Sequence, residues 1–155
     1  MPYLIDGHNL IPKLGMRLDF IDDELELITL LQEYCRVRRT QVEVYFDGAP
    51  AGQIGLHKSG RVVAHFISKA SSADAAIESR LALMGKTVKN WTVVSSDNRI
   101  KRAAGALHAR ILSSEDFSWE MKKALSKIGE DRDEGIKLNS SEVDDWIKLF
   151  EKRGK

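Results

Sequence analysis

Apolar residues form two kinds of pattern along the first 128 positions of the chain. Short runs rich in β-branched and aromatic residues predict strands, and longer segments with apolar positions three or four residues apart predict helices. The strands are expected over 3–5, 42–46, 62–67, 91–94 and 110–112, and the helices over 22–38, 72–84, 98–104 and 114–128. Because the two kinds alternate, we expect a three-layer α/β/α sandwich with a mainly parallel sheet between two layers of helices.

Two segments interrupt this alternation. Residues 48–60 contain four glycines and one proline and are predicted to form a loop. Residues 129–139 are polar, lack any periodicity and are predicted to form a linker. After the linker, apolar residues at three- and four-residue spacing predict a last helix over 140–153. We expect this helix to pack on the main domain, residues 1–128, with a partner protein as the alternative target.

The composition is that of a globular protein, with 43% hydrophobic and 30% charged residues. No apolar run approaches the roughly 20 residues that span a bilayer, and the first residues carry no secretion leader. The single cysteine, Cys35, cannot form an internal disulfide, which favours a reducing compartment. We therefore expect a cytoplasmic protein with no membrane partner. Cys35 and the three tryptophans (Trp91, Trp119 and Trp146) are expected in the core.

Charge is distributed unevenly along the chain, although the formal net charge is only +1. Between Gly48 and Ser114 there are ten lysines and arginines but only three acids, which gives this section a net charge of +7. The surplus of acid lies in 19–33 and 115–145. A basic face beside a few isolated carboxylates suits the recognition of phosphates. The alternative is a solvated surface on which like charges cluster by chance.

Four aspartates come after predicted strands. Asp6 and Asp47 directly follow the first and second strands, Asp97 follows the fourth after two serines, and Asp74 lies a few residues past the third. Parallel strands place their carboxyl ends at one edge of a sheet, so these side chains are expected to converge there. Two unit charges about 4 Å apart repel by roughly 4 kcal/mol at an effective dielectric of 20. The cluster therefore predicts one or two bound cations, and oxygen-only ligands favour Mg²⁺ or Mn²⁺.

Each aspartate also has a structural interpretation. Asp6 and Asp47 precede glycines and could simply form turns. Asp74 could belong to a capping box that begins at Ser71, and Asp97 could cap the helix that follows it. A carboxylate at the start of a helix can still face the site, so the two roles are compatible.

Other polar residues near the aspartates are weaker candidates. Glu78 lies one turn after Asp74, and Asn9 lies three residues after Asp6, where it could orient that carboxylate or contact a phosphate. Ser95 and Ser96 could bond a phosphate through their hydroxyls. Surface or loop positions without function are the alternative for all of these. The candidates for holding the substrate backbone are Lys69, Arg99, Lys101 and Arg102.

Four segments that contain these residues resemble, in order, the YacP-like branch of the NYN domain family, within the PIN-like nuclease superfamily. They are 4–9, 44–48, 72–78 and 93–99, and the resemblance covers about residues 2–117. It implies a PIN-like sandwich and metal-dependent hydrolysis of RNA, single-stranded by analogy, in the processing or decay of mRNA or rRNA. It also makes the ribosome a candidate partner. Carried over residue by residue, it implies Asp6, Asp47, Asp74 and Asp97 as metal ligands, with Asn9 and Glu78 in support.

Three other functions remain as alternatives. A phosphatase of the haloacid dehalogenase type requires Asp-x-Asp after the first strand, whereas His8 stands two positions beyond Asp6. A phosphoacceptor receiver domain requires an acidic pair at that place. A non-catalytic RNA- or ribosome-binding module with the same fold is the strongest alternative, although all four aspartates are present.

Overall fold

The computed structural model of the protein describes residues 1–14 and 21–130. The helix predicted over 140–153 and nearly all of the predicted linker lie outside the described residues. Helix α5 (Ser114–Glu130) ends two residues past its predicted end, so the first two residues assigned to the linker are helical. No helix in the described ranges is both long and apolar enough to cross a bilayer.

Six strands form one sheet in the order β3-β4-β2-β1-β5-β6. Their bounds are Tyr3–Asp6 for β1, Val42–Ala49 for β2, Gly55–Ser59 for β3, Val62–Ser68 for β4, Thr92–Val94 for β5 and Arg110–Leu112 for β6. Every neighbouring pair is parallel except β3 with β4. The predicted mainly parallel sheet is therefore confirmed.

The segment 48–60, predicted to be a loop, contains a strand, so that prediction is wrong. After a short 3₁₀ helix, η2 (Ala51–Gln53), strand β3 pairs antiparallel with β4 along the edge of the sheet. Four of the five residues of β3 are exposed, so the strand shows no apolar alternation in the sequence. The glycines mark its two ends, because Gly55 and Gly60 both have positive φ, which other residues rarely adopt.

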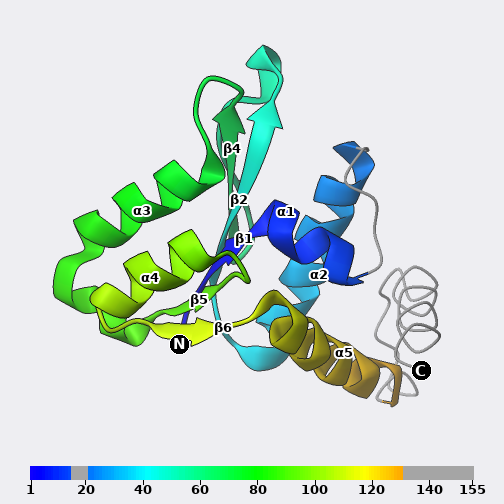
Figure 1. The fold of residues 1–155 in the computed structure, drawn as a ribbon. Helices are drawn as coiled ribbons and strands as arrows, with labels where there is room; N and C mark the ends of the chain where they lie inside the picture. Colours follow the sequence, from blue (N-terminus) through cyan, green and yellow to red (C-terminus); the bar gives the residue numbers. More distant parts are fainter. Residues whose placement is uncertain (15–20, 131–155) are drawn as a thin grey trace.

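Helices cover both faces of the sheet and complete the predicted sandwich (Figure 1). One face carries α1 (Gly7–Leu10), the 3₁₀ helix η1 (Ile11–Leu14), α2 (Ile21–Arg38) and α5. The other face carries α3 (Ala73–Met84), the 3₁₀ helix η3 (Gly85–Asn90) and α4 (Asn98–Ala106). Successive strand residues point to opposite faces, so Ile5 enters the first core and Leu4 the second.

The two cores hold Cys35, as predicted, but only some of the tryptophans. Cys35 is fully buried in α2, and burial raises the pKa of its thiol to about 11, as expected for a packing residue. Trp91 is half-buried against the second core. Trp119 is 44% exposed on α5, so its predicted place in the core is wrong. Trp146 lies outside the described residues.

Candidate acidic site

Strands β1 and β2 bring Asp6 and Asp47 to the carboxyl edge of the sheet. Asp6 is the buried last residue of β1, in register with Tyr45 of β2. Asp47 lies where the pairing of β2 with β4 shifts register, and the following Gly48 has a φ of 68°. One oxygen of the Asp47 carboxylate accepts a hydrogen bond from the backbone N–H of Ala73 at the start of α3. The bulge in β2 thus ties Asp47 to the helix that carries the next acid.

Asp74 is the second residue of helix α3, and Asp97 directly precedes helix α4. The cap of α3 is Ser72, whose hydroxyl accepts from the N–H of Ala75 at 3.1 Å, so the capping box predicted from Ser71 is wrong. Asp97 caps α4, because its carboxylate accepts from the N–H of Arg99 at 2.7 Å. The capping interpretation of Asp97 therefore holds, and it leaves the second carboxylate oxygen available.

Charge repulsion links all four aspartates. The pKa of Asp6 is raised to about 6, first by burial and then by the charges of Asp74 and Asp47. The pKa of Asp74 is also raised, by partial burial and then by Asp97, Asp47 and Glu78, while Arg99 opposes the rise. The charges of neighbouring aspartates thus disfavour the ionised forms of Asp6 and Asp74. The structure thus brings the four predicted aspartates into one electrostatic cluster.

The cluster is not a closed metal cage. Within the described ranges, no group of three or more ligating side chains lies close enough to hold a metal ion together. The donors nevertheless fit a hard, hydrated cation, because all are carboxylate oxygens and their charges are poorly compensated. Mg²⁺ keeps several waters and is commonly bound through only one or two carboxylates. These residues therefore suit Mg²⁺ or Mn²⁺ better than zinc, which favours four close nitrogen or sulfur ligands.

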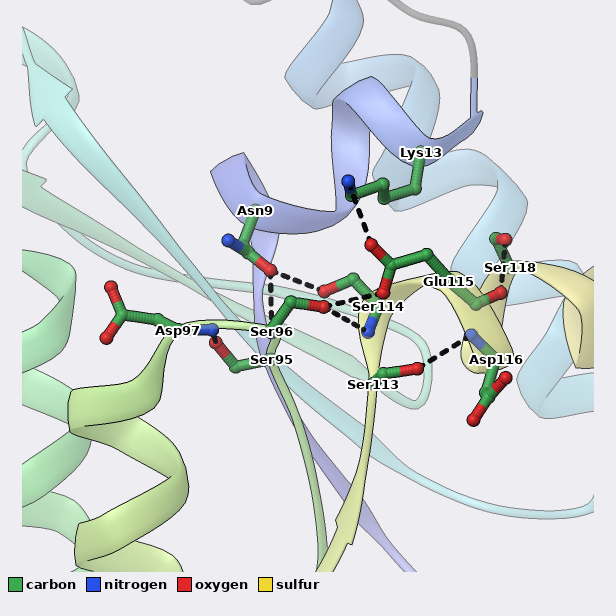
Figure 2. Close-up of polar contacts among 10 residues, drawn as sticks. All are labelled: Asn9, Lys13, Ser95, Ser96, Asp97, Ser113, Ser114, Glu115, Asp116 and Ser118. Carbon is green, nitrogen blue, oxygen red and sulfur yellow. Dashed lines mark hydrogen bonds and ion pairs between the residues drawn. The ribbon is translucent and has the colours of Figure 1, made fainter.

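Asn9 connects three separate elements beside the aspartates (Figure 2). Its Oδ1 accepts from the backbone N–H of Ser96 at 2.8 Å and from the hydroxyl of Ser114 at 2.6 Å. These bonds join α1 to the loop before α4 and to the start of α5. Figure 2 shows the Asn9 amide nitrogen directed away from the serines, toward the side on which the Asp97 carboxylate lies.

The hydroxyls of the two candidate serines are both engaged within the protein. Ser95 is fully buried and its Oγ accepts from the N–H of Asp97 at 3.0 Å. Ser96 donates to the carboxylate of Glu115 at 2.8 Å, and Glu115 forms an ion pair with Lys13 at 2.8 Å. These hydrogen bonds to Lys13 and Ser96 lower the pKa of Glu115 to about 2. The structure thus gives the serines a role in holding the Asp97 loop.

The remaining candidates lie at the rim of the cluster. Glu78 pairs with Arg99 at 2.5 Å, so its charge is compensated by the protein itself. Arg102 reaches the backbone carbonyl of Asn98 at 3.4 Å. Lys69 is exposed in the turn between β4 and α3, and Lys101 is half-buried in α4. Among these cations, Arg99 interacts with the charges of Asp74 and Asp97.

His8 and Glu24 are close to the site and were missed by sequence reasoning. The Nε2 atom of His8 lies 2.6 Å from a carboxylate oxygen of Glu24, and its Nδ1 accepts from the backbone N–H of Asp47 at 3.3 Å. Burial lowers the pKa of His8, but Glu24, Asp47 and Asp6 raise it by more, so the net shift is upward. The only signal in the sequence is the position of His8, two residues after Asp6.

Comparison with known proteins agrees with this arrangement. The family model for the YacP-like NYN domain matches residues 3–151. The chain belongs to the YacP-like NYN domain family. A crystal structure of Rae1 (YacP) from Bacillus subtilis superposes with a TM-score of 0.70 at 24% identity, covering 98% of this chain and 89% of that one. A mutant of the same protein gives 0.69 at 23%, covering 99% and 96%. No curated protein matches the sequence of this family member.

Proposed function

We propose that this YacP-like protein is a divalent-metal-dependent endoribonuclease whose active site is the cluster of Asp6, Asp47, Asp74 and Asp97. The observation that carries the proposal is the convergence of these four carboxylates from four chain segments, with the pKa of Asp6 raised to about 6. Uncompensated repulsion of this kind lowers the free energy of unfolding, and a bound cation would relieve it. Cation binding would therefore explain why the carboxylates lie together.

The residues divide the work between binding and positioning. Asp6, Asp47, Asp74 and Asp97 would bind one or two Mg²⁺ or Mn²⁺ ions, and the N–H of Ala73 holds the Asp47 carboxylate in place. Such an ion polarises a phosphoryl oxygen and lowers the pKa of a coordinated water. One of the carboxylates receives the proton of the attacking water as the phosphodiester bond breaks. Asn9 and the serines keep the Asp97 loop in position.

The substrate and the cellular location are proposed by analogy with the family. The proposed substrate is single-stranded RNA, in the processing or decay of mRNA or rRNA, and the proposed location is the cytoplasm. Lys69, Arg99 and Arg102 are exposed and would contact phosphates. The ribosome is the proposed wider partner.

One observation favours a second function, a non-catalytic RNA- or ribosome-binding module. No three carboxylates of the described chain lie close enough to hold one metal ion directly. RNA binding without cleavage at any metal concentration would support that function over the nuclease.

The test is cleavage of labelled single-stranded RNA and DNA in Mn²⁺, Mg²⁺ or chelator. We expect cleavage of RNA with either metal, none in chelator, and background rates for Asp6→Asn and Asp97→Asn. Asp116→Asn is the matched control, because Asp116 is exposed on α5, on the far side of the serines from Asp97 (Figure 2). Equal rates for the wild type and both site variants would exclude this cluster as the active site.

A further inference from the structure

Two adjoining pockets lie at the amino edge of the sheet, opposite the acidic site. One, of about 410 Å³, lies on the α3 side and is lined by strands β2, β3 and β4 together with Arg80 and Trp91. The other, of about 420 Å³, lies beside the end of α2. Gly60 and Arg61, in the turn between β3 and β4, line both. The two pockets therefore form one continuous surface around Arg61.

The surface around Arg61 has a large excess of positive charge. Its lining carries five cations and two acids. Both acids are already paired: Glu43 with Arg80 at 3.0 Å, and Glu33 with Arg36 at 3.1 Å. The cations are Arg36, Arg39, Lys58, Arg61 and Arg80.

Three of these cations have no counter-ion within the described ranges. Arg39, Lys58 and Arg61 are exposed, and none of them takes part in an ion pair there. Arg39 directly follows α2 and has a left-handed backbone with a φ of 53°. Lys58 lies on β3, and Arg61 lies in the turn between β3 and β4. The end of α2 and the β3–β4 hairpin thus place these three cations on the same surface, where an anionic partner can bind them.

The pocket on the α3 side adds apolar and planar surface to the charge. Leu56 is 61% exposed, and Val63 on β4 lines the same pocket. The guanidinium of Arg80 lies 5.8 Å from the centre of the Trp91 ring and is held by a two-nitrogen contact with Glu43. Planar guanidinium groups and apolar surface accept unstacked bases, while free lysines and arginines accept phosphates. Each nucleotide of single-stranded RNA offers both features, whereas a run of aspartate and glutamate residues offers only the charge.

We infer that the surface around Arg61 is a second RNA-binding surface, which holds a strand at the edge of the sheet opposite the acidic site. The inference rests on the proposed function for its choice of RNA. Along strand β2, Val42 and Asp47 are five residue steps apart, roughly 16 Å at about 3.3 Å per residue. One RNA chain can span that distance, so this surface anchors a flanking segment while another segment reaches the aspartates.

The test is the affinity of labelled single-stranded RNA, measured by fluorescence anisotropy in chelator, where no cleavage is required. The variant combines Arg39→Asn, Lys58→Gln and Arg61→Gln, with asparagine chosen because it tolerates the left-handed conformation. The control combines Lys86→Gln, Arg110→Gln and Lys123→Gln, which removes the same charge from other exposed positions. We expect the variant to weaken binding about 10- to 100-fold and the slope of log K against log salt to fall by roughly 2.

Equal losses in the variant and the control would overturn the inference, as would an unchanged salt slope. If the wild type bound polyglutamate as tightly as RNA and the variant lost both interactions, the partner would be an acidic protein rather than RNA. Cleavage of an oligonucleotide about three nucleotides long, roughly 10 Å at about 3.4 Å per nucleotide and so too short to reach both sites, separates this inference from the proposed function. We expect the variant to cleave it at the wild-type rate in Mn²⁺, whereas failure of the wild type to cleave would count against the nuclease and leave the binding result standing.

Discussion

At the scale of single residues, Asp6 shows that the acidic site is maintained at a cost in stability. Its carboxylate is buried at the end of β1 and faces the charges of Asp74 and Asp47. The pKa is about 6 in the folded protein, against 3.8 in the absence of these effects. A raised acid pKa means that the folded state prefers the protonated form, so the free energy of unfolding falls as pH rises from about 4 to about 6.

Asp6→Asn should therefore stabilise the metal-free protein at neutral pH. We expect the free energy of unfolding, measured by urea denaturation in chelator at pH 7, to rise by on the order of 1–3 kcal/mol. The gain should shrink as pH is lowered from 6 toward 4 and vanish well below 3.8, where the wild-type carboxylate is protonated in both states. Asp116→Asn, at an exposed position, serves as the control. Destabilisation by Asp6→Asn at pH 7 would show that the carboxylate is well compensated.

The position after Asp6 has no room for a side chain, so it is occupied by glycine, Gly7. A Cβ at this position would lie 2.8 Å from the carbonyl oxygen of Tyr45 and would also collide with the ring of Phe46. The residue is thus required for the close approach of α1 to β2, whereas the sequence suggested only a turn.

Gly7→Ala is expected to lower the free energy of unfolding by about 1–3 kcal/mol, because backbone and ring must both shift. Thermal or urea denaturation measures the change. Gly52→Ala is the matched control, since a Cβ there meets no atom within 4 Å. A loss no larger than that of Gly52→Ala would refute the close approach.

At the scale of elements, the sequence predicted the regular helices and the buried strands, because their apolar periodicity is set by the core they face. The exceptions are short or exposed. Strand β3 lies exposed at the sheet edge, and α1 and η1 are four residues each, too short for a periodic pattern. Sequence reasoning therefore missed the elements whose form depends on neighbours rather than on burial of their own apolar face.

The candidate site likewise contains features that the sequence predicts and contacts that it does not predict. The convergence of the four aspartates could be predicted, because each follows a strand or begins the next helix. The contacts of Asn9 with Ser114 and of His8 with Glu24 could not, since they join residues 105 and 16 positions apart. Such pairs depend on how α1 packs between α2 and α5, which no local pattern encodes.

Asn9→Ala tests the link between α1, the Asp97 loop and α5. It would leave the N–H of Ser96 and the hydroxyl of Ser114 without their acceptor. We expect a loss of about 1–3 kcal/mol in unfolding free energy and slower RNA cleavage, because the Asp97 loop loses its anchor. Asn9→Asp keeps an accepting oxygen and should retain most of the stability at about pH 4, where protonation of the Asp6 carboxyl reduces repulsion by the added charge. Equal destabilisation by both variants would contradict the role of Oδ1.

At the scale of the whole molecule, the sheet separates two surfaces of opposite charge. The carboxyl edge gathers four aspartates, and the amino edge gathers Arg39, Lys58 and Arg61. A net charge of +1 conceals this separation, which only the path of the strands through the sheet makes visible. The helix predicted over 140–153 stays a prediction, and so does its packing on the domain.

Binding of Mn²⁺ measured by isothermal titration calorimetry tests the central claim most directly. Asp74→Asn is the decisive variant, because the charge of Asp74 couples to those of Asp6, Asp47 and Asp97. We expect the wild type and Asp116→Asn to bind one or two ions, and Asp74→Asn to bind at least about tenfold more weakly. Equal Mn²⁺ affinity in the wild type and Asp74→Asn, or no binding by the wild type, would contradict the claim that these aspartates form a cation site.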